Sequence, residues 1–351
     1  MKQRGKSARR MLALVTAVLA ALHPVPVFSE SVSSNTVAMA VRFNHTLDSY
    51  QPEKDHYRFY FTYKTVHPWW DAVAMGMEEA QRQFLARGIT VTYEYLAPEQ
   101  ASAKDQIRRL RAASAGGYDV IGVDVADESV ISPVIDEMAE AGLRVMTFSS
   151  SDAAPGCKRI AYVGNTHNTR DGAALAEALC RKLGGRGKIA ILVGTPGAPC
   201  HEERAAGIRE TLSRYPEIEV VATEYDQDSI GIARNLTTKI LSEHEDLAGI
   251  ICCNMSNPVG AARAVRETGR SVVIVGMDHD REALQYLADG TIYCLGIQDC
   301  FSIGFDTIQV AVKVADGILP GKYYPEKTEE PTTLIYREDA REMLELLYGE
   351  I

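Results

Sequence analysis

The chain has 351 residues, 46% of them hydrophobic and 24% charged, which is enough for two compact α/β units of about 100 to 150 residues each. This composition excludes a disordered or fibrous protein. The formal net charge of −10 argues against broad electrostatic attraction to nucleic acid or anionic lipid, so we expect no nucleic-acid partner.

The first 29 residues predict a signal peptide. Five basic residues lie between Lys2 and Arg10, the apolar run Met11 to Leu22 follows, and Val27 and Ser29 have the small-residue spacing that a signal peptidase accepts. Twelve apolar residues are few for a membrane span. We therefore expect export to the periplasm or the extracellular space with cleavage near Ser29; retention of the segment as a membrane anchor is the alternative.

Residues 30–56 are mostly polar and have no sustained period, so we interpret them as a linker. From Tyr57 onward, short apolar runs alternate with amphipathic stretches. The predicted strands are 57–64, 89–95, 119–125, 144–148, 188–193, 218–223, 248–253, 271–276 and 291–297. The predicted helices between them are 70–87, 103–115, 129–141, 171–183, 201–214, 230–243, 258–268 and 280–289. Near-continuous apolar strands separated by helices indicate parallel sheets covered on both faces.

One set of alternating strands and helices precedes residue 163 and a second set follows it, which favours two doubly wound, Rossmann-like lobes over one large sheet. Ligands of doubly wound sheets bind outside the carboxyl ends of the strands. The polar and aromatic residues that stand there, or near the head of the next helix, are His67, Trp69, Trp70, Asp127, Ser149, Asp152, Arg204, Asn254, Asp278 and Gln298. Indole faces, amides, carboxylates and a guanidinium together suit a small polyhydroxylated ligand.

Each candidate also has a plainer explanation. The tryptophan pair could be packing, and Asp127 could cap the helix that begins near Ser129. Arg204 could be a surface residue paired with a neighbouring acid. Asn254 and Asp278 could be turn or cap residues. Their recurrence at successive strand ends is what favours a binding site.

Neither catalysis nor metal binding is indicated. The sequence has no G-x-S-x-G elbow, no H-E-x-x-H and no Walker loop, so we expect no enzyme and no cofactor. The seven cysteines lack the spacing of a zinc site. Their odd number leaves at least one unpaired, and a disulfide between Cys157 and Cys200 is one possible pairing.

Residues 57–337 resemble the type I periplasmic sugar-binding proteins, the ribose- and glucose-binding proteins that serve ABC importers. The segments that carry the resemblance are HPWWDAV (67–73), TFSSSDAAPGCKRIAYVGN (147–165), GGRGKIAIL (184–192), ERAAGI (203–208), NMSNPVGAARAV (254–265), VIVGMD (273–278) and LGIQD (295–299).

The resemblance implies that Trp69 and Trp70 flank a sugar ring and that His67 touches a hydroxyl. It further implies that Arg204, Asn254, Asp278 and Gln298 bind the sugar from the C-terminal lobe and the hinge. The sequence departs from the family at Ser149, where relatives usually have an acidic residue; Asp152, three residues later, could reach inward instead.

The expected domains are a signal peptide (1–29), a linker (30–56), an N-terminal lobe (57–163 plus 299–330) and a C-terminal lobe (164–298 plus 331–351), with hinge crossings near 163–166, 297–300 and 329–333. The expected function is capture of a monosaccharide or related polyol by a monomer that delivers it to an ABC permease. The alternatives are a sensory protein that presents its closed form to a two-component or chemotaxis receptor, the effector domain of a repressor, which residues 1–56 argue against, and an extracellular enzyme.

Overall fold

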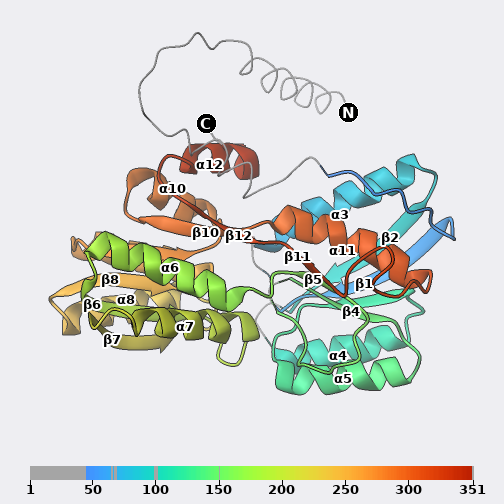
Figure 1. Ribbon diagram of the computed structural model, residues 1–351, viewed down its shortest axis with the longest axis horizontal. Helices are drawn as coiled ribbons and strands as arrows, with labels where there is room; N and C mark the ends of the chain where they lie inside the picture. The colour runs from blue at the N-terminus through green and yellow to red at the C-terminus, as the bar shows by residue number, and fades with distance from the viewer. Residues whose placement is uncertain (1–44, 65, 67–68, 99–101, 150, 350–351) are drawn as a thin grey trace, which may run out of the picture. The chain divides into compact units, whose positions relative to one another are not determined.

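The computed structural model describes residues 45–64, 66, 69–98, 102–149 and 151–349 (Figure 1). The predicted signal peptide, residues 30–44 of the predicted linker and the candidate His67 lie outside these ranges. Within the described ranges, every helix is too short or too polar to cross a membrane.

The first sheet contains six parallel strands in the order β11-β5-β4-β3-β1-β2. Their bounds are β1 (His56–Thr62), β2 (Thr90–Leu96), β3 (Val120–Val123), β4 (Val145–Ser149), β5 (Tyr162–Gly164) and β11 (Lys327–Glu329). Two pairs of helices cover its faces, and each pair closes its own apolar core (Figure 1). The pairs are α3 (Trp69–Ala86) with α11 (Cys300–Ala315), and α4 (Ala103–Ser114) with α5 (Glu128–Glu140).

The second sheet repeats the plan in the order β12-β10-β9-β8-β6-β7, with β12 antiparallel to β10. Its strands are β6 (Arg186–Val193), β7 (Glu217–Tyr225), β8 (Leu247–Cys252), β9 (Val273–Met277), β10 (Cys294–Gln298) and β12 (Thr332–Ile335). On one face lie α6 (Asn168–Leu183) and α7 (Pro199–Leu212). The other face carries α8 (Ile230–Glu243), α9 (Ser256–Thr268), α10 (Arg281–Asp289) and α12 (Ala340–Tyr348).

Local sequence explains where several helices begin and end. The Asp127 carboxylate accepts a hydrogen bond from the backbone N–H of Ser129 at the start of α5, and Ser229 caps α8 in the same way. Gly142 and Gly269 follow α5 and α9 with φ of 83° and 66°, the left-handed conformation in which glycine commonly ends a helix. The helix α9 begins two residues before Pro258, which therefore lies within the first turn and not at its start.

The helices α3 and α11 cross at two glycines. A Cβ atom on Gly76 would lie 2.0 Å from the carbonyl oxygen of Phe301, and one on Gly304 would lie 1.9 Å from that of Val73. This close approach brings α11 down onto the first sheet, where nearly every one of its side chains is buried.

Three segments carry the chain between the two sheets: β5 to α6, β10 to α11 and β11 to β12. Hydrogen bonds join the first and third of these segments, from Glu330 N to Gly164 O (2.6 Å) and from Asn165 Nδ2 to Thr332 Oγ1 (2.9 Å). The predicted fold class, two doubly wound lobes joined by three crossings, is confirmed. The residue boundaries proposed for the lobes stay a prediction.

Residues 45–55, within the predicted linker, pack against α3 and α11. The backbone N–H of Leu47 donates to Gln83 Oε1 (2.9 Å), Lys313 Nζ pairs with Asp48 Oδ2 (2.6 Å), and the side chains of Leu47 and Tyr50 are buried. Two apolar side chains in a polar segment give no periodic pattern, so the sequence alone does not reveal this packing.

All seven cysteines lie in the described ranges, and all are free. The possible disulfide between Cys157 and Cys200 is therefore not formed.

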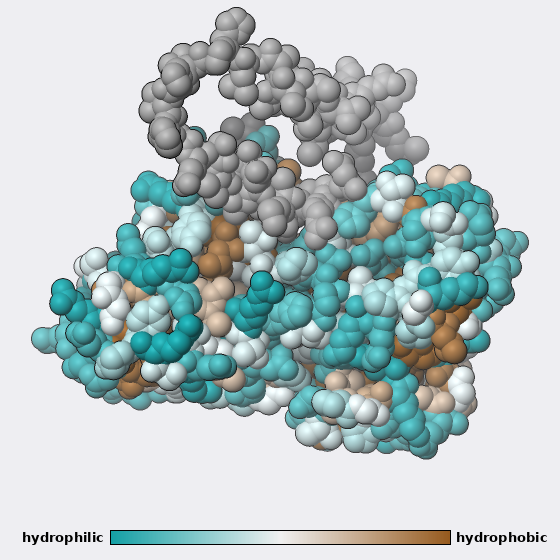
Figure 2. All heavy atoms as spheres, viewed as in Figure 1, coloured by the Kyte–Doolittle hydropathy of each residue, from teal (hydrophilic) through white to brown (hydrophobic). Residues whose placement is uncertain are grey.

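The face of the molecule in Figure 2 is mostly hydrophilic, with apolar side chains in separate patches of the kind that folded proteins commonly expose.

Candidate functional site

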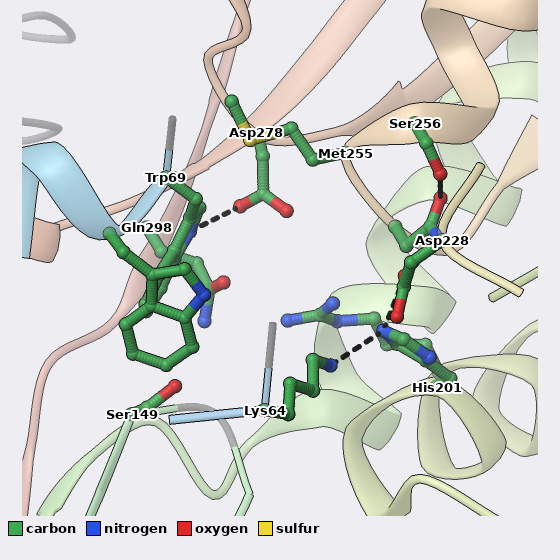
Figure 3. A pocket seen from close by; sticks show the side chains of 12 residues that line it. Lys64, Trp69, Ser149, His201, Asp228, Met255, Ser256, Asp278 and Gln298 are labelled. Carbon is green, nitrogen blue, oxygen red and sulfur yellow. Dashed lines mark hydrogen bonds and ion pairs between the residues drawn. The ribbon is translucent and has the colours of Figure 1, made fainter. Parts of the chain in front are cut away.

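The strand orders place the candidate site. In each sheet the second strand lies on one side of the first and the third strand on the other, so the direction in which successive strands are added across the sheet reverses at β1 and at β6, although the strands stay parallel. Side chains beyond the carboxyl ends of strands meet at such points. A cavity of about 430 Å³, counting space open to solvent, lies there with residues of both lobes around it (Figure 3). It is lined by Lys64, Trp69, Trp70, Ser149, His201, Arg204, Asp228, Asn254, Met255, Ser256, Asp278 and Gln298.

The tryptophan pair opens α3 and forms an aromatic wall. The ring of Trp69 packs edge-on against that of Trp70, with centroids 4.5 Å apart, and Trp70 lies on Tyr63 at 4.6 Å. Trp69 Nε1 donates to Asp278 Oδ1 across the cavity (3.1 Å), which joins the two lobes (Figure 3). Both rings are buried, yet both line the cavity.

Three lining residues hold a left-handed backbone that side chains seldom adopt: Ser149 (φ 84°), Asp228 (φ 58°) and Asp278 (φ 72°). Such conformations cost about 1–3 kcal/mol each and persist only where the surroundings impose them. At Ser149 two hydrogen bonds hold this conformation, because Asn165 N and the Tyr162 hydroxyl both donate to the Ser149 carbonyl oxygen.

Arg204 and Asp278 bring opposite charges to the cavity from the C-terminal lobe. Only 1% of Arg204 is exposed, contrary to the interpretation of a surface residue, and its Nη1 donates to the Cys253 carbonyl at 3.0 Å. Burial raises the pKa of Asp278 to about 6, although the charge of Arg204 and the hydrogen bond from Trp69 oppose that rise.

A network of polar side chains organises the side of the cavity between β6 and β8. Asn254 Nδ2 donates to Asp228 Oδ1 (2.5 Å), and the Ser256 hydroxyl donates to Asp226 Oδ2 (2.7 Å). Burial raises the pKa of Asp226 to about 6. For Asp228, burial also acts to raise the pKa, but His201 and Lys64 overcome it and hold that pKa below the ordinary value.

Lys64 comes from the N-terminal lobe and faces α7 of the other lobe (Figure 3). Its Nζ lies 3.3 Å from His201 Nε2 and 3.8 Å from Cys200 Sγ. Burial would lower the pKa of Lys64, but the nearby acidic groups Cys200, Asp228 and Asp124 overcome that effect and raise it. The ammonium therefore keeps its charge at the cavity.

Seven residues proposed from the sequence are brought together around this cavity: Trp69, Trp70, Ser149, Arg204, Asn254, Asp278 and Gln298. Asp127 does not line it and serves as the cap of α5. Asp152 does not line it either, because Arg159 Nε and Nη2 grip both carboxylate oxygens at 2.7 Å each and Thr147 Oγ1 donates to one of them.

Sequence reasoning missed five lining residues: Lys64, His201, Asp228, Met255 and Ser256. The predicted strand 57–64 ends at Lys64 and the predicted helix 201–214 starts at His201, so both residues lie at element boundaries next to the cavity. A rule that examines two residues on either side of each predicted strand end finds Lys64 and Met255, whereas Ser256 lies three residues beyond its strand. Asp228 lies three residues after β7, and only the strand order brings that loop to the site.

Comparisons with known proteins point to one family. The family model described as "Periplasmic binding protein domain" matches residues 59–318. A ribose import binding protein of Bacillus subtilis is 24% identical over 269 residues, which cover 76% of this chain and 83% of that protein. A D-allose-binding periplasmic protein of Escherichia coli is 24% identical over 74% of this chain and 83% of its own length. The solved structure of a glucose-galactose binding protein from Geobacillus stearothermophilus superimposes with a TM-score of 0.73 at 26% identity, covering 82% of this chain and 99% of that one.

Proposed function

The chain belongs to the family of periplasmic binding protein domains, and from this premise we propose that it is an exported solute-binding protein for a monosaccharide or related polyol. It takes the ligand into the cavity between its lobes and delivers it to an ABC importer. The relatives named for ribose and allose import support this assignment.

The observation that carries the proposal is the composition of the cavity wall. An indole wall on the N-terminal lobe faces a guanidinium, an amide and a carboxylate on the other lobe, and these are the partners that sugar C–H faces and hydroxyl groups need. Twelve described residues of the two lobes surround this one cavity, and we favour a single sugar unit over an oligosaccharide as its ligand.

Closure follows from the placement of the lining residues on both lobes. A ligand that contacts Trp69 from one side and Arg204 from the other is bound more tightly when the lobes are together, so binding shifts an open–closed population toward the closed form. The three crossings between the sheets are the places where the backbone would bend. A permease then recognises the closed form.

We also propose the signal peptide and the lobe boundaries that the sequence predicts. Residues 1–29 direct export, and the lobes comprise 57–163 plus 299–330 and 164–298 plus 331–351. His67 remains a candidate contact, whereas Asp127 and Asp152 have other roles and are left out of the proposed site. The protein acts as a binding protein and not as an enzyme.

A thermal-shift screen of monosaccharides and polyols tests the proposal. A ligand at 100 times its Kd stabilises the folded protein by about 2.7 kcal/mol, which corresponds to a rise in Tm of roughly 4 °C for a protein of this size. A rise for at least one member of the panel is the expected result. A flat response across ribose, allose, arabinose, xylitol, glucose, galactose and the sugar acids ribonate, glucuronate and galacturonate contradicts it.

A further inference from the structure

The cavity contains hydrogen-bond donors that no protein group satisfies. Arg204 is almost completely buried, and its Nη1 donates to a carbonyl, but its Nε and Nη2 have no partner among the described residues. Gln298 Nε2 is also buried without a partner in that part of the chain. Leaving a buried donor unpaired destabilises a protein, most of all when the donor is charged, so a ligand is the expected partner.

The acceptors of the cavity are mostly occupied. Asp228 Oδ1 accepts from Asn254 and Oδ2 accepts from Thr195 Oγ1 (2.7 Å). Asn254 Oδ1 accepts from the backbone N–H of Asn257 (2.9 Å) and from the Ser256 hydroxyl (3.1 Å). Asp278 Oδ1 accepts from Trp69, which leaves its second oxygen. The free hydrogen-bonding capacity is therefore dominated by donors, and a well-matched ligand is rich in acceptors.

Two of the donor groups are cations from opposite lobes that form no ion pair with a carboxylate in the described ranges. Arg204 lies on α7, and Lys64 follows β1. The contacts of Lys64 Nζ are with Cys200 Sγ, at the long distance of 3.8 Å, and with His201 Nε2.

The contact with His201 does not satisfy the ammonium. The backbone N–H of Thr195 donates to His201 Nδ1 (2.9 Å), so neutral His201 carries its proton on Nε2. Two donors then face each other at 3.3 Å. The ammonium of Lys64 is left without a good acceptor at the cavity.

The free Nε and Nη2 atoms of Arg204 form one edge of a planar guanidinium, and this edge matches the two oxygens of a carboxylate. We propose that the ligand carries a carboxylate, as in a uronic or aldonic acid, with that group between Arg204 of one lobe and Lys64 of the other. This inference rests on the proposed function and names the class of sugar. Asp228 and Asp278 also line the cavity, so a monoanion fits it better than a dianionic phosphate.

Titration calorimetry with matched pairs tests the inference: glucose against glucuronate, galactose against galacturonate and ribose against ribonate. Charge-assisted hydrogen bonds contribute about 1.5–3 kcal/mol each, so we expect at least one acid to bind tenfold or more tightly than its neutral parent. The acid's advantage should shrink at high salt.

Lys64→Met is the informative variant, and Lys104→Met, at an exposed helical position, is the matched control. We expect Lys64→Met to weaken binding of the acid at least tenfold and of the neutral parent less than threefold, with no change in the control. An unchanged acid preference in Lys64→Met overturns the role of Lys64.

The outcomes separate this inference from the function on which it rests. Neutral sugars that bind as tightly as their acids, or more tightly, overturn the carboxylate and leave the sugar-binding function standing. Failure of every sugar and every acid to bind overturns the function and the inference together.

Discussion

Replacing Asp278 with asparagine should stabilise the unliganded protein while weakening ligand binding. Asparagine has nearly the same shape, tolerates the left-handed backbone at this position, and offers Oδ1 to Trp69 in the same way. The substitution therefore removes a buried charge and leaves the local geometry intact.

The size of the effect follows from the pKa of Asp278. Burial raises it from 3.8 to about 6. Above pH 6, where the carboxyl is ionised, a difference of this size lowers the free energy of unfolding by about 3 kcal/mol. Below pH 4 the carboxyl is protonated in both the folded and unfolded states, and the cost disappears. This contribution makes the wild type less stable as pH rises from about 4 to 6.

Urea unfolding of the wild type and Asp278→Asn at pH 4 and pH 7.5 measures this effect. We expect the variant to be more stable by up to about 3 kcal/mol at pH 7.5 and by much less at pH 4. Asp124 and Asp226 also have raised pKa values, about 7 and about 6, so the difference between the two proteins is the relevant quantity. Asp55→Asn, at an exposed position, is the control and should change neither value.

Ligand affinity should move in the opposite direction. Loss of a hydrogen bond to a charged acceptor costs about 1.5–3 kcal/mol, so Kd should rise tenfold or more. A variant that is less stable than the wild type at pH 7.5, or equally changed at both pH values, refutes the reasoning about burial.

Three further substitutions test other parts of the account. Trp69→Ala should weaken ligand binding at least tenfold by calorimetry, and Trp69→Phe should weaken it less because a ring remains; equal affinities in all three proteins would remove Trp69 from the site. Ser149→Gly should raise the free energy of unfolding by about 1 kcal/mol because glycine accepts φ of 84° without strain, and a loss of stability would show that the hydroxyl matters more. Asp152→Ala should destabilise the protein by about 3 kcal/mol because it removes both short hydrogen bonds of the buried Arg159 and leaves it only the longer contact with Glu326, with unchanged ligand affinity; weaker binding would return Asp152 to the site.

Much of the fold was predictable because the central strands of the two sheets are almost entirely apolar and buried. The runs around β3 and β8 are nearly all buried, so hydrophobicity alone identifies them. The short strands β5, β11 and β12 lie at the crossings and are too short for a recognisable pattern. The helix α11 was missed because it is buried on nearly every side and has no polar face.

The site was predictable where a strand end projects directly into the cavity, as at Asn254, Asp278 and Gln298. It was not predictable where the position of a side chain depends on the path of a loop. The loop after β4 turns Asp152 toward Arg159, and the loop after β7 brings Asp228 back to the cavity. The left-handed backbone of Ser149, Asp228 and Asp278 is imposed by tertiary contacts, which residue type alone does not reveal.

Fluorescence titration gives the most direct test of the central claim that the interlobe cavity is the ligand site. Trp69 and Trp70 are the two tryptophans of the whole sequence, and both line the cavity. A sugar or sugar acid that stabilises the protein should change the tryptophan emission saturably, with one equivalent bound per chain. A stabilising ligand that leaves the emission unchanged would bind elsewhere and contradict the account.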